Sequence, residues 1–162
     1  MKDLLIDYAT YHIWANQQLL KIALRLTEEQ QNQTIVSSFD SVRKTILHML
    51  DAESIWWQRL QLQEKIIRPS DNNSSTLKEI VQQMDVQSKV WLEKIKGMKE
   101  NQLQFVFAYQ NTKREMFKQP VWQMLLHLYN HANFHRGQLV TLYRQLGITK
   151  IPATDFILWS RK

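Results

Sequence analysis

Apolar residues recur along four stretches of the chain at the spacing of an amphipathic helix. The stretches cover residues 2–26, 41–62, 76–97 and 120–147. In each, apolar side chains follow one another at three or four positions, which places them on one helical face. Thr76 and Glu79 have the spacing of a capping box, which predicts where the third helix begins. Pro120 suits the first turn of the fourth helix, and Gly147 is typical of the position just past a helix end.

The segments between these helices differ in character. The polar segment before the second helix predicts a loop or a short extra turn, with Ile35, Val36 and Phe39 as its apolar anchors. Residues 63–75 are rich in Ser, Asn and Asp and contain a proline, which indicates a loop. This loop is long enough to cross one end or one side of a helical bundle.

Residues 102–118 alternate apolar and polar side chains around a polar centre, as two short strands do. We therefore expect a two-stranded hairpin or an extended excursion before the last helix. The pattern as a whole predicts an all-α fold: a four-helix bundle with a long crossover, formed by residues 1–162 as a single domain.

The composition of the chain argues against several kinds of site and function. The chain has 162 residues, 3 Gly, 3 Pro and no Cys, so disulfides, thiolate metal sites and a cysteine nucleophile of its own are excluded. Neither an apolar run of about 18 residues nor a signal-peptide pattern occurs, so we expect no membrane span and a cytoplasmic location. The net charge is +6, but the basic residues are scattered, so specific nucleic-acid binding is not expected.

Two histidines interrupt the apolar stripe of the fourth helix. His131 and His135 lie one turn apart on the face that also carries Met124, Leu128 and Leu139. Burying two imidazoles is unfavourable unless each nitrogen has a partner, and one bound cation would serve both. The spacing favours a metal site and the alternative of two satisfied core histidines equally.

A third ligand would have to come from another helix. His48 is the best candidate because it lies mid-helix beside an apolar face. His127 is displaced towards the edge of the stripe, so we expect it beside the site or on the surface. His12 lies on the apolar stripe of the first helix and could line the same cavity, but we expect it to be a core histidine bonded to a backbone or side-chain oxygen. An all-imidazole ligand set suits zinc, nickel, copper or iron.

Two better-known metal sites do not fit. His131 and His135 have the spacing of the zinc-protease helix, but no Glu follows the first histidine, so that general base is missing. The paired Glu-x-x-His motifs of di-iron bundles are also absent from the sequence.

Several motifs together resemble the DinB family of the DinB/YfiT-like superfamily. They are residues 11–16 (YHIWAN), 46–53 (ILHMLDAE), 57–60 (WQRL), 127–138 (HLYNHANFHRGQ), 144–147 (RQLG) and 152–155 (PATD). The resemblance covers nearly the whole chain. It implies a four-helix bundle with a long crossover, often a homodimer, that holds one divalent metal ion through His48, His131 and His135. Zinc or nickel is expected ahead of iron or manganese.

The resemblance leaves the reaction open. Superfamily relatives include thiol S-transferases and isomerases that use low-molecular-weight thiols such as bacillithiol or mycothiol. It therefore implies a metal-dependent S-transferase that joins such a thiol to a small electrophile, with a non-catalytic metal-binding stress-response protein as the alternative. No catalytic residue is assigned. Arg136 is expected either to hold the thiol's carboxylates near the mouth or to form a surface ion pair. Gly137 is expected to serve helix packing, with making room at the site as the alternative. Asp155 is expected to cap the final turn, with a hydrogen bond to a metal-binding histidine as the alternative.

Overall fold

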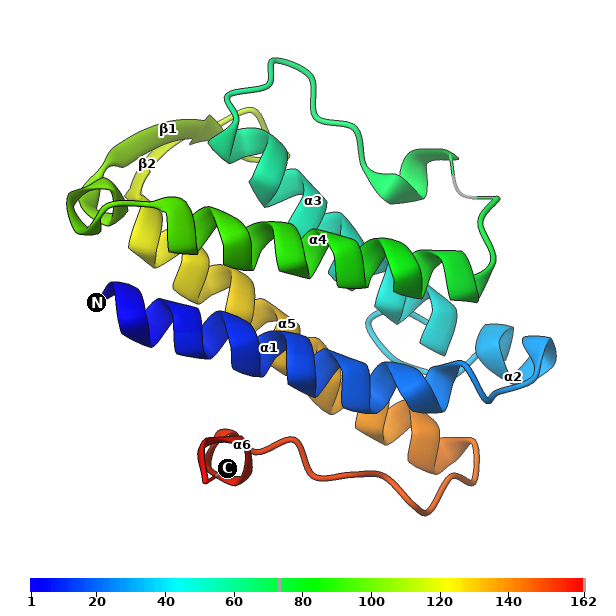
Figure 1. The fold of residues 1–162 in the computed structure, drawn as a ribbon. Helices are drawn as coiled ribbons and strands as arrows, with labels where there is room; N and C mark the ends of the chain where they lie inside the picture. The colour runs from blue at the N-terminus through cyan, green and yellow to red at the C-terminus, as the bar shows by residue number, and fades with distance from the viewer. Residues whose placement is uncertain (73, 162) are drawn as a thin grey trace.

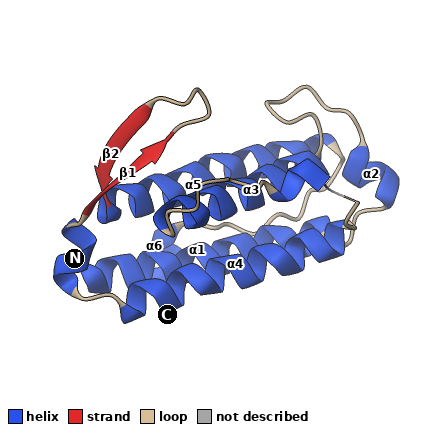
Figure 2. Cartoon of the chain, turned by 90° about the horizontal axis from the view of Figure 1, so that it is seen from above, coloured by secondary structure: helices blue, strands red, loops and turns tan. Residues whose placement is uncertain are grey.

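Four long helices form the body of the part of the chain that the structure, a computed structural model, describes: residues 1–72 and 74–161. The helices are α1 (Lys2–Ala23), α3 (Val42–Leu60), α4 (Leu77–Gly97) and α5 (Val121–Gln145). Figure 2 shows α3 and α5 in one layer and α1 and α4 in the other. α1 and α3 each pack on both α4 and α5, so the four helices form a closed ring. The predicted all-α four-helix bundle is confirmed.

The long crossover lies between α3 and α4. Glu53 bonds Ser88, and four residues further along α3 the ring of Trp57 lies 5.1 Å from that of Trp91, so these neighbouring helices run parallel. A parallel pair needs a connection that returns along the length of the bundle. Residues 61–72 and 74–76 belong to this connection, which includes a short 3₁₀ helix, Pro69–Asn72. Figure 1 shows it above α3 and α4. Within the predicted loop 63–75, residue 73 lies outside the described residues.

The helix ends agree closely with the sequence signals. Thr76 and Glu79 form both hydrogen bonds of the capping box at the start of α4, and the hydroxyl of Ser41 caps α3. Gly147 has φ +81°, the left-handed conformation that suits a residue just past a helix. Pro120 differs from its prediction. It is the residue before α5 and the last residue of the preceding strand, because its φ of −67° also suits an extended backbone.

The connection between α1 and α3 contains a short helix, α2 (Glu28–Asn32). Ile35 is buried and Phe39 is half-buried, as predicted for anchors. Val36 is fully exposed, so its prediction as an anchor was wrong. Ile35 occupies the core position and its amide bonds the Asp40 carbonyl, which leaves the next side chain on the solvent side of the turn.

The predicted hairpin is present. β1 (Val106–Gln110) pairs antiparallel with β2 (Met116–Pro120) after a 3₁₀ turn at Glu100–Gln104. Figure 1 shows the hairpin at the end of the bundle where α3 ends and α5 begins. A last short helix, α6 (Phe156–Ser160), follows Asp155. Asp155 stands at the capping position but its side chain makes no capping hydrogen bond.

A buried polar network takes at least one residue from each long helix. The carboxylate of Glu53 in α3 lies 2.9 Å from Nε2 of His12 in α1 and accepts from the hydroxyl of Ser88 in α4 at 2.9 Å. Arg136 in α5 lies 3.3 Å from Nδ1 of the same imidazole and donates to Asn16 at 3.0 Å. His12 therefore donates from Nε2 to the carboxylate and accepts at Nδ1 from the guanidinium. The network fixes the four helices relative to one another.

This network settles two predictions. His12 is 2% exposed and bonded to an oxygen, so its prediction as a core histidine is confirmed. Arg136 is also 2% exposed, so both a place at the mouth of the site and a surface ion pair were wrong. Residues 135 and 136 face different directions because successive helical residues are turned by about 100°.

We expect Glu53→Ala to destabilise the protein by about 3–5 kcal/mol, because it leaves the buried guanidinium without a compensating charge. Ser88→Ala, which removes one donor and keeps both charges, should lower the free energy of unfolding by about 2 kcal/mol. Urea unfolding of the two variants beside the wild type measures the difference. Equal losses in both would show that the charge balance is not what stabilises the network.

Candidate metal centre

Three imidazoles meet between α3 and α5. His48 comes from α3, and His131 and His135 come from consecutive turns of α5. Nε2 of His131 lies 3.1 Å from Nε2 of His48 and 3.1 Å from Nε2 of His135. One ring nitrogen from each residue lies within 4.8 Å of the other two. We call this cluster the triad. The structure thus brings together the three histidines that the sequence singled out as ligands.

The spacing of the triad fits a bound metal ion better than hydrogen bonding. Imidazole nitrogens lie about 2.0–2.1 Å from zinc, so two ligands at a near-tetrahedral angle are about 3.3 Å apart. The observed 3.1 Å is close to this value. Each Nε2 carries either one proton or one lone pair, so Nε2 of His131 cannot form a well-directed hydrogen bond to both neighbours. A cation at the centre would satisfy all three lone pairs, and the triad could therefore hold a metal ion.

Neighbouring side chains orient the imidazoles. Nδ1 of His135 donates to Gln138 Oε1 at 2.7 Å, which leaves the Nε2 lone pair directed into the triad. The amide of Gln138 in turn donates to Ser38 at 2.9 Å. Phe39 stacks on the ring of His48, with centroids 4.0 Å apart. The segment before α3 therefore supports ligands on both helices.

The histidines of the triad are neutral at physiological pH. The pKa of His48 and of His131 is lowered to about 4, mainly by burial and to a smaller extent by the neighbouring imidazoles. Burial also lowers the pKa of His135, while its hydrogen bond to Gln138 acts in the opposite direction. Neutral imidazole is the form that binds metals. The site therefore offers unprotonated ligands down to mildly acidic pH.

The other histidines lie outside the triad. His127 is exposed, its ring is 6.0 Å from that of His131, and it packs edge-on against Trp56. This agrees with its predicted place beside the site. Across residues 1–72 and 74–161, the triad is the one group of at least three His, Asp or Glu side chains that could hold a metal ion.

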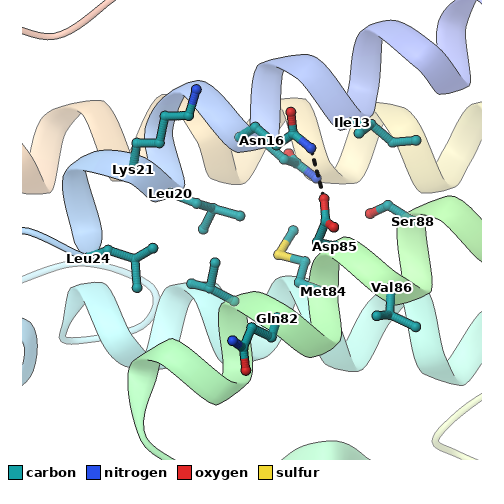
Figure 3. Close-up of a pocket in the computed structure, with 12 residues that line it drawn as sticks. Ile13, Asn16, Leu20, Lys21, Leu24, Gln82, Met84, Asp85, Val86 and Ser88 are labelled. Carbon is teal, nitrogen blue, oxygen red and sulfur yellow. Dashed lines mark hydrogen bonds between the residues drawn. The ribbon is translucent and has the colours of Figure 1, made fainter.

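A groove lies between α1 and α4, across the bundle from the triad. Figure 3 shows this groove, which has a volume of about 490 Å³. Leu20, Met84 and Val86 contribute to its largely apolar lining. Its main polar contact is the hydrogen bond from Gln17 to Asp85 at 2.8 Å. Lacking a histidine, the groove has no direct part in metal binding.

The model of the DinB family matches residues 1–160. The chain belongs to the DinB family. It is 27% identical over 169 residues to Protein DinB of Bacillus subtilis (strain 168), covering 98% of this chain and 95% of that protein. A crystal structure of a DinB-like protein from Bacillus cereus ATCC 10987 superimposes with a TM-score of 0.69. That pair is 22% identical, and the match covers 89% of this chain and 91% of the other.

The DinB-family resemblance seen in the sequence is thus confirmed, and so is the fold that it implied. Among the described helices, none is both long enough and apolar enough to cross a membrane.

Sequence reasoning missed some of the residues around the triad. Gln138 stands in the same motif as His135, and its spacing of three residues was the available signal. The roles of Ser38 and Phe39 had no local signal, because Ser38 accepts a hydrogen bond from Gln138 and Phe39 stacks on His48, both in other segments of the chain. Gly137 was assigned to helix packing, which was wrong: a Cβ added there would meet nothing within 4 Å.

We expect the metal-free protein to lose stability as the pH falls from about 6.5 towards 4. In the unfolded chain, histidines take up protons near pH 6.5, whereas His48 and His131 in the folded protein do so only near pH 4. The unfolded state therefore binds more protons in this range, and acid favours unfolding. Urea midpoints at pH 7, 6 and 5, measured with a chelator present, should fall less steeply for His48→Gln/His131→Gln. An unchanged slope in this variant would contradict the assignment.

Proposed function

We propose that the protein binds one divalent metal ion through Nε2 of His48, His131 and His135. The observation that carries this proposal is the convergence of three neutral nitrogens, with Nε2 of His131 lying 3.1 Å from Nε2 of each of the other two. The hydrogen bond from His135 to Gln138 supports it, because metal-binding histidines usually donate their second ring N–H to an oxygen. Three nitrogen ligands favour zinc or nickel over the harder cations, which prefer oxygen.

We further propose that the metal serves an S-transferase reaction between a low-molecular-weight thiol and a small electrophile. Three protein ligands leave a coordination position open, which is typical of catalytic rather than structural sites. His48 and His131 are only partly buried, so small molecules can reach them. All three ligands are neutral, so a bound divalent ion would keep its full charge, which favours an anionic partner such as a thiolate.

In this reaction the cosubstrate would supply the sulfur and the protein the metal site. A bound divalent ion lowers the pKa of a thiol that coordinates it, so that the thiolate forms near neutral pH. The chain has no cysteine, so the reacting sulfur belongs to the cosubstrate. The thiol proton passes to solvent, the sulfur forms a bond to the electrophilic carbon, and the leaving group departs with the electron pair of the broken bond. The stacked ring of Phe39 shields one side of His48 from water.

Metal content tests the first part of the proposal. Tag-free wild-type protein should contain about one equivalent of zinc or nickel by elemental mass spectrometry, and His131→Ala/His135→Ala should contain almost none, because one imidazole alone binds weakly. His127→Ala is the matched control, since this exposed histidine of the same helix lies outside the triad. Loss of metal in the control as well, or no metal in the wild type after incubation with divalent ions, would overturn the proposal.

Turnover tests the second part. Metal-loaded protein should consume bacillithiol or another small thiol together with an electrophile such as monobromobimane, faster than the uncatalysed reaction. Chelation should abolish the difference, and restoring the metal should recover it. If metal-loaded protein shows no turnover with any thiol tested, the S-transferase proposal fails and the protein is a metal-binding protein without this chemistry.

A further inference from the structure

A small cavity lies beside the triad at the hairpin end of the bundle. It has a volume of about 240 Å³, and residues from α3, α5 and both strands of the hairpin line it. The lining residues are Trp56, Tyr109, Gln119, Gln123, Met124 and His127. His127 connects the cavity to the triad, because its ring packs against Trp56 and lies one turn from His131. This volume suits one end of a small molecule, since whole drug-sized ligands occupy about 300–1,000 Å³.

An arginine without a counter-ion packs against two of the residues that line this cavity. The guanidinium carbon of Arg59 lies 4.7 Å from the ring centre of Trp56 and 5.3 Å from that of Tyr109. Two aromatic contacts fix the position of the guanidinium and offset part of the cost of its burial. Among the described residues, no hydrogen bond or ion pair to the side chain of Arg59 occurs, and its Nε is buried without a partner. A half-buried guanidinium with free donors is well placed to bind an anion.

The surroundings of Arg59 favour an anion for two further reasons. No carboxylate lines the cavity, and the amides of Gln119 and Gln123 make no side-chain hydrogen bond to another described residue. These amides can therefore donate to a ligand. The neutral histidines of the triad would leave the charge of a bound divalent ion uncompensated nearby. A small molecule with a carboxylate at one end and a reacting group at the other fits this distribution of charge.

The helix geometry sets the length of that molecule. His48 and Trp56 are eight residues apart on α3, which corresponds to about 12 Å along the helix axis. Side chains on a helix lean towards its N-terminus, so Arg59 leans back over Trp56 towards the triad. A molecule the size of a tripeptide, about 10 Å when extended, would reach from the triad to Arg59.

We propose that Arg59, packed against the rings of Trp56 and Tyr109, binds the carboxylate of a small organic thiol whose sulfur lies at the triad. This subsite names the substrate class of the proposed S-transferase and rests on that proposed function. It replaces Arg136, which is buried in the polar network, as the residue that holds the cosubstrate's negative charge.

Calorimetric binding of S-methylglutathione to the metal-loaded protein tests the subsite without any turnover, because this probe keeps the carboxylates and has no free thiol. We expect Arg59→Gln to raise its dissociation constant at least about tenfold, as the loss of a charged hydrogen bond implies. Arg59→Lys should give an intermediate value, since it keeps the charge and loses the planar fork. The ester form of the probe should bind wild type as weakly as the free acid binds Arg59→Gln.

Arg144→Gln is the matched control, because it removes the same charge from an exposed position near the far end of α5. An equal loss of affinity in this control, or unchanged affinity in Arg59→Gln, would overturn the subsite. So would equal binding of the ester, or inorganic phosphate displacing the probe at a much lower concentration than acetate. If the probe binds through Arg59 but no thiol is ever turned over, the S-transferase proposal fails and the anion subsite stands.

Discussion

The candidate site depends on helix packing that keeps three imidazole nitrogens together between α3 and α5. Lone pairs that face one another at 3.1 Å do not attract, so the packing of α3 on α5 must place His48 opposite His131 and His135. The antiparallel pairing of these helices does so, and it brings Trp56 against His127 two turns further along α3. The same pairing therefore positions both the triad and the cavity beside it. All three ligands lie on helices, so helix packing, and not a loop, brings them together.

The buried network of Glu53, His12 and Arg136 explains how that packing stays in register. A purely apolar core allows helices to slide by a turn at modest cost, whereas a carboxylate and a guanidinium inside the core tolerate few arrangements. Glu53 follows His48 by five residues, and Arg136 directly follows His135. Each of the two metal-site helices thus carries a ligand on one face and a network residue on another. Because the network also takes Ser88 from α4, it links the candidate site to the far layer of the bundle.

The parts of the fold that the sequence predicted are those with local causes. The capping box of Thr76 and Glu79, the left-handed Gly147 and the alternating hairpin depend on a few neighbouring residues, and all were found. The histidine pair was visible because i and i+4 spacing is itself local. Arg136 was misplaced because its partners, Asn16 and His12, are more than a hundred residues away. Val36 was misplaced because the backbone turn that exposes it, closed by a bond from Ile35 to Asp40, leaves no periodic signal.

The two ends of the α3–α5 interface are surrounded by different side chains, and the hairpin provides those at one end. At one end, the segment before α3 supplies Phe39 and Ser38, which orient the histidines. At the other end, β1 brings Tyr109 against Arg59 and Trp56 of α3. Tyr109 is far along the sequence from both of these residues. The hairpin packs less extensively than the long helices, and its strands expose Phe117 and Met116. Changes in the hairpin would therefore alter what enters beside the triad while the polar network keeps the bundle, and with it the ligand geometry, unchanged.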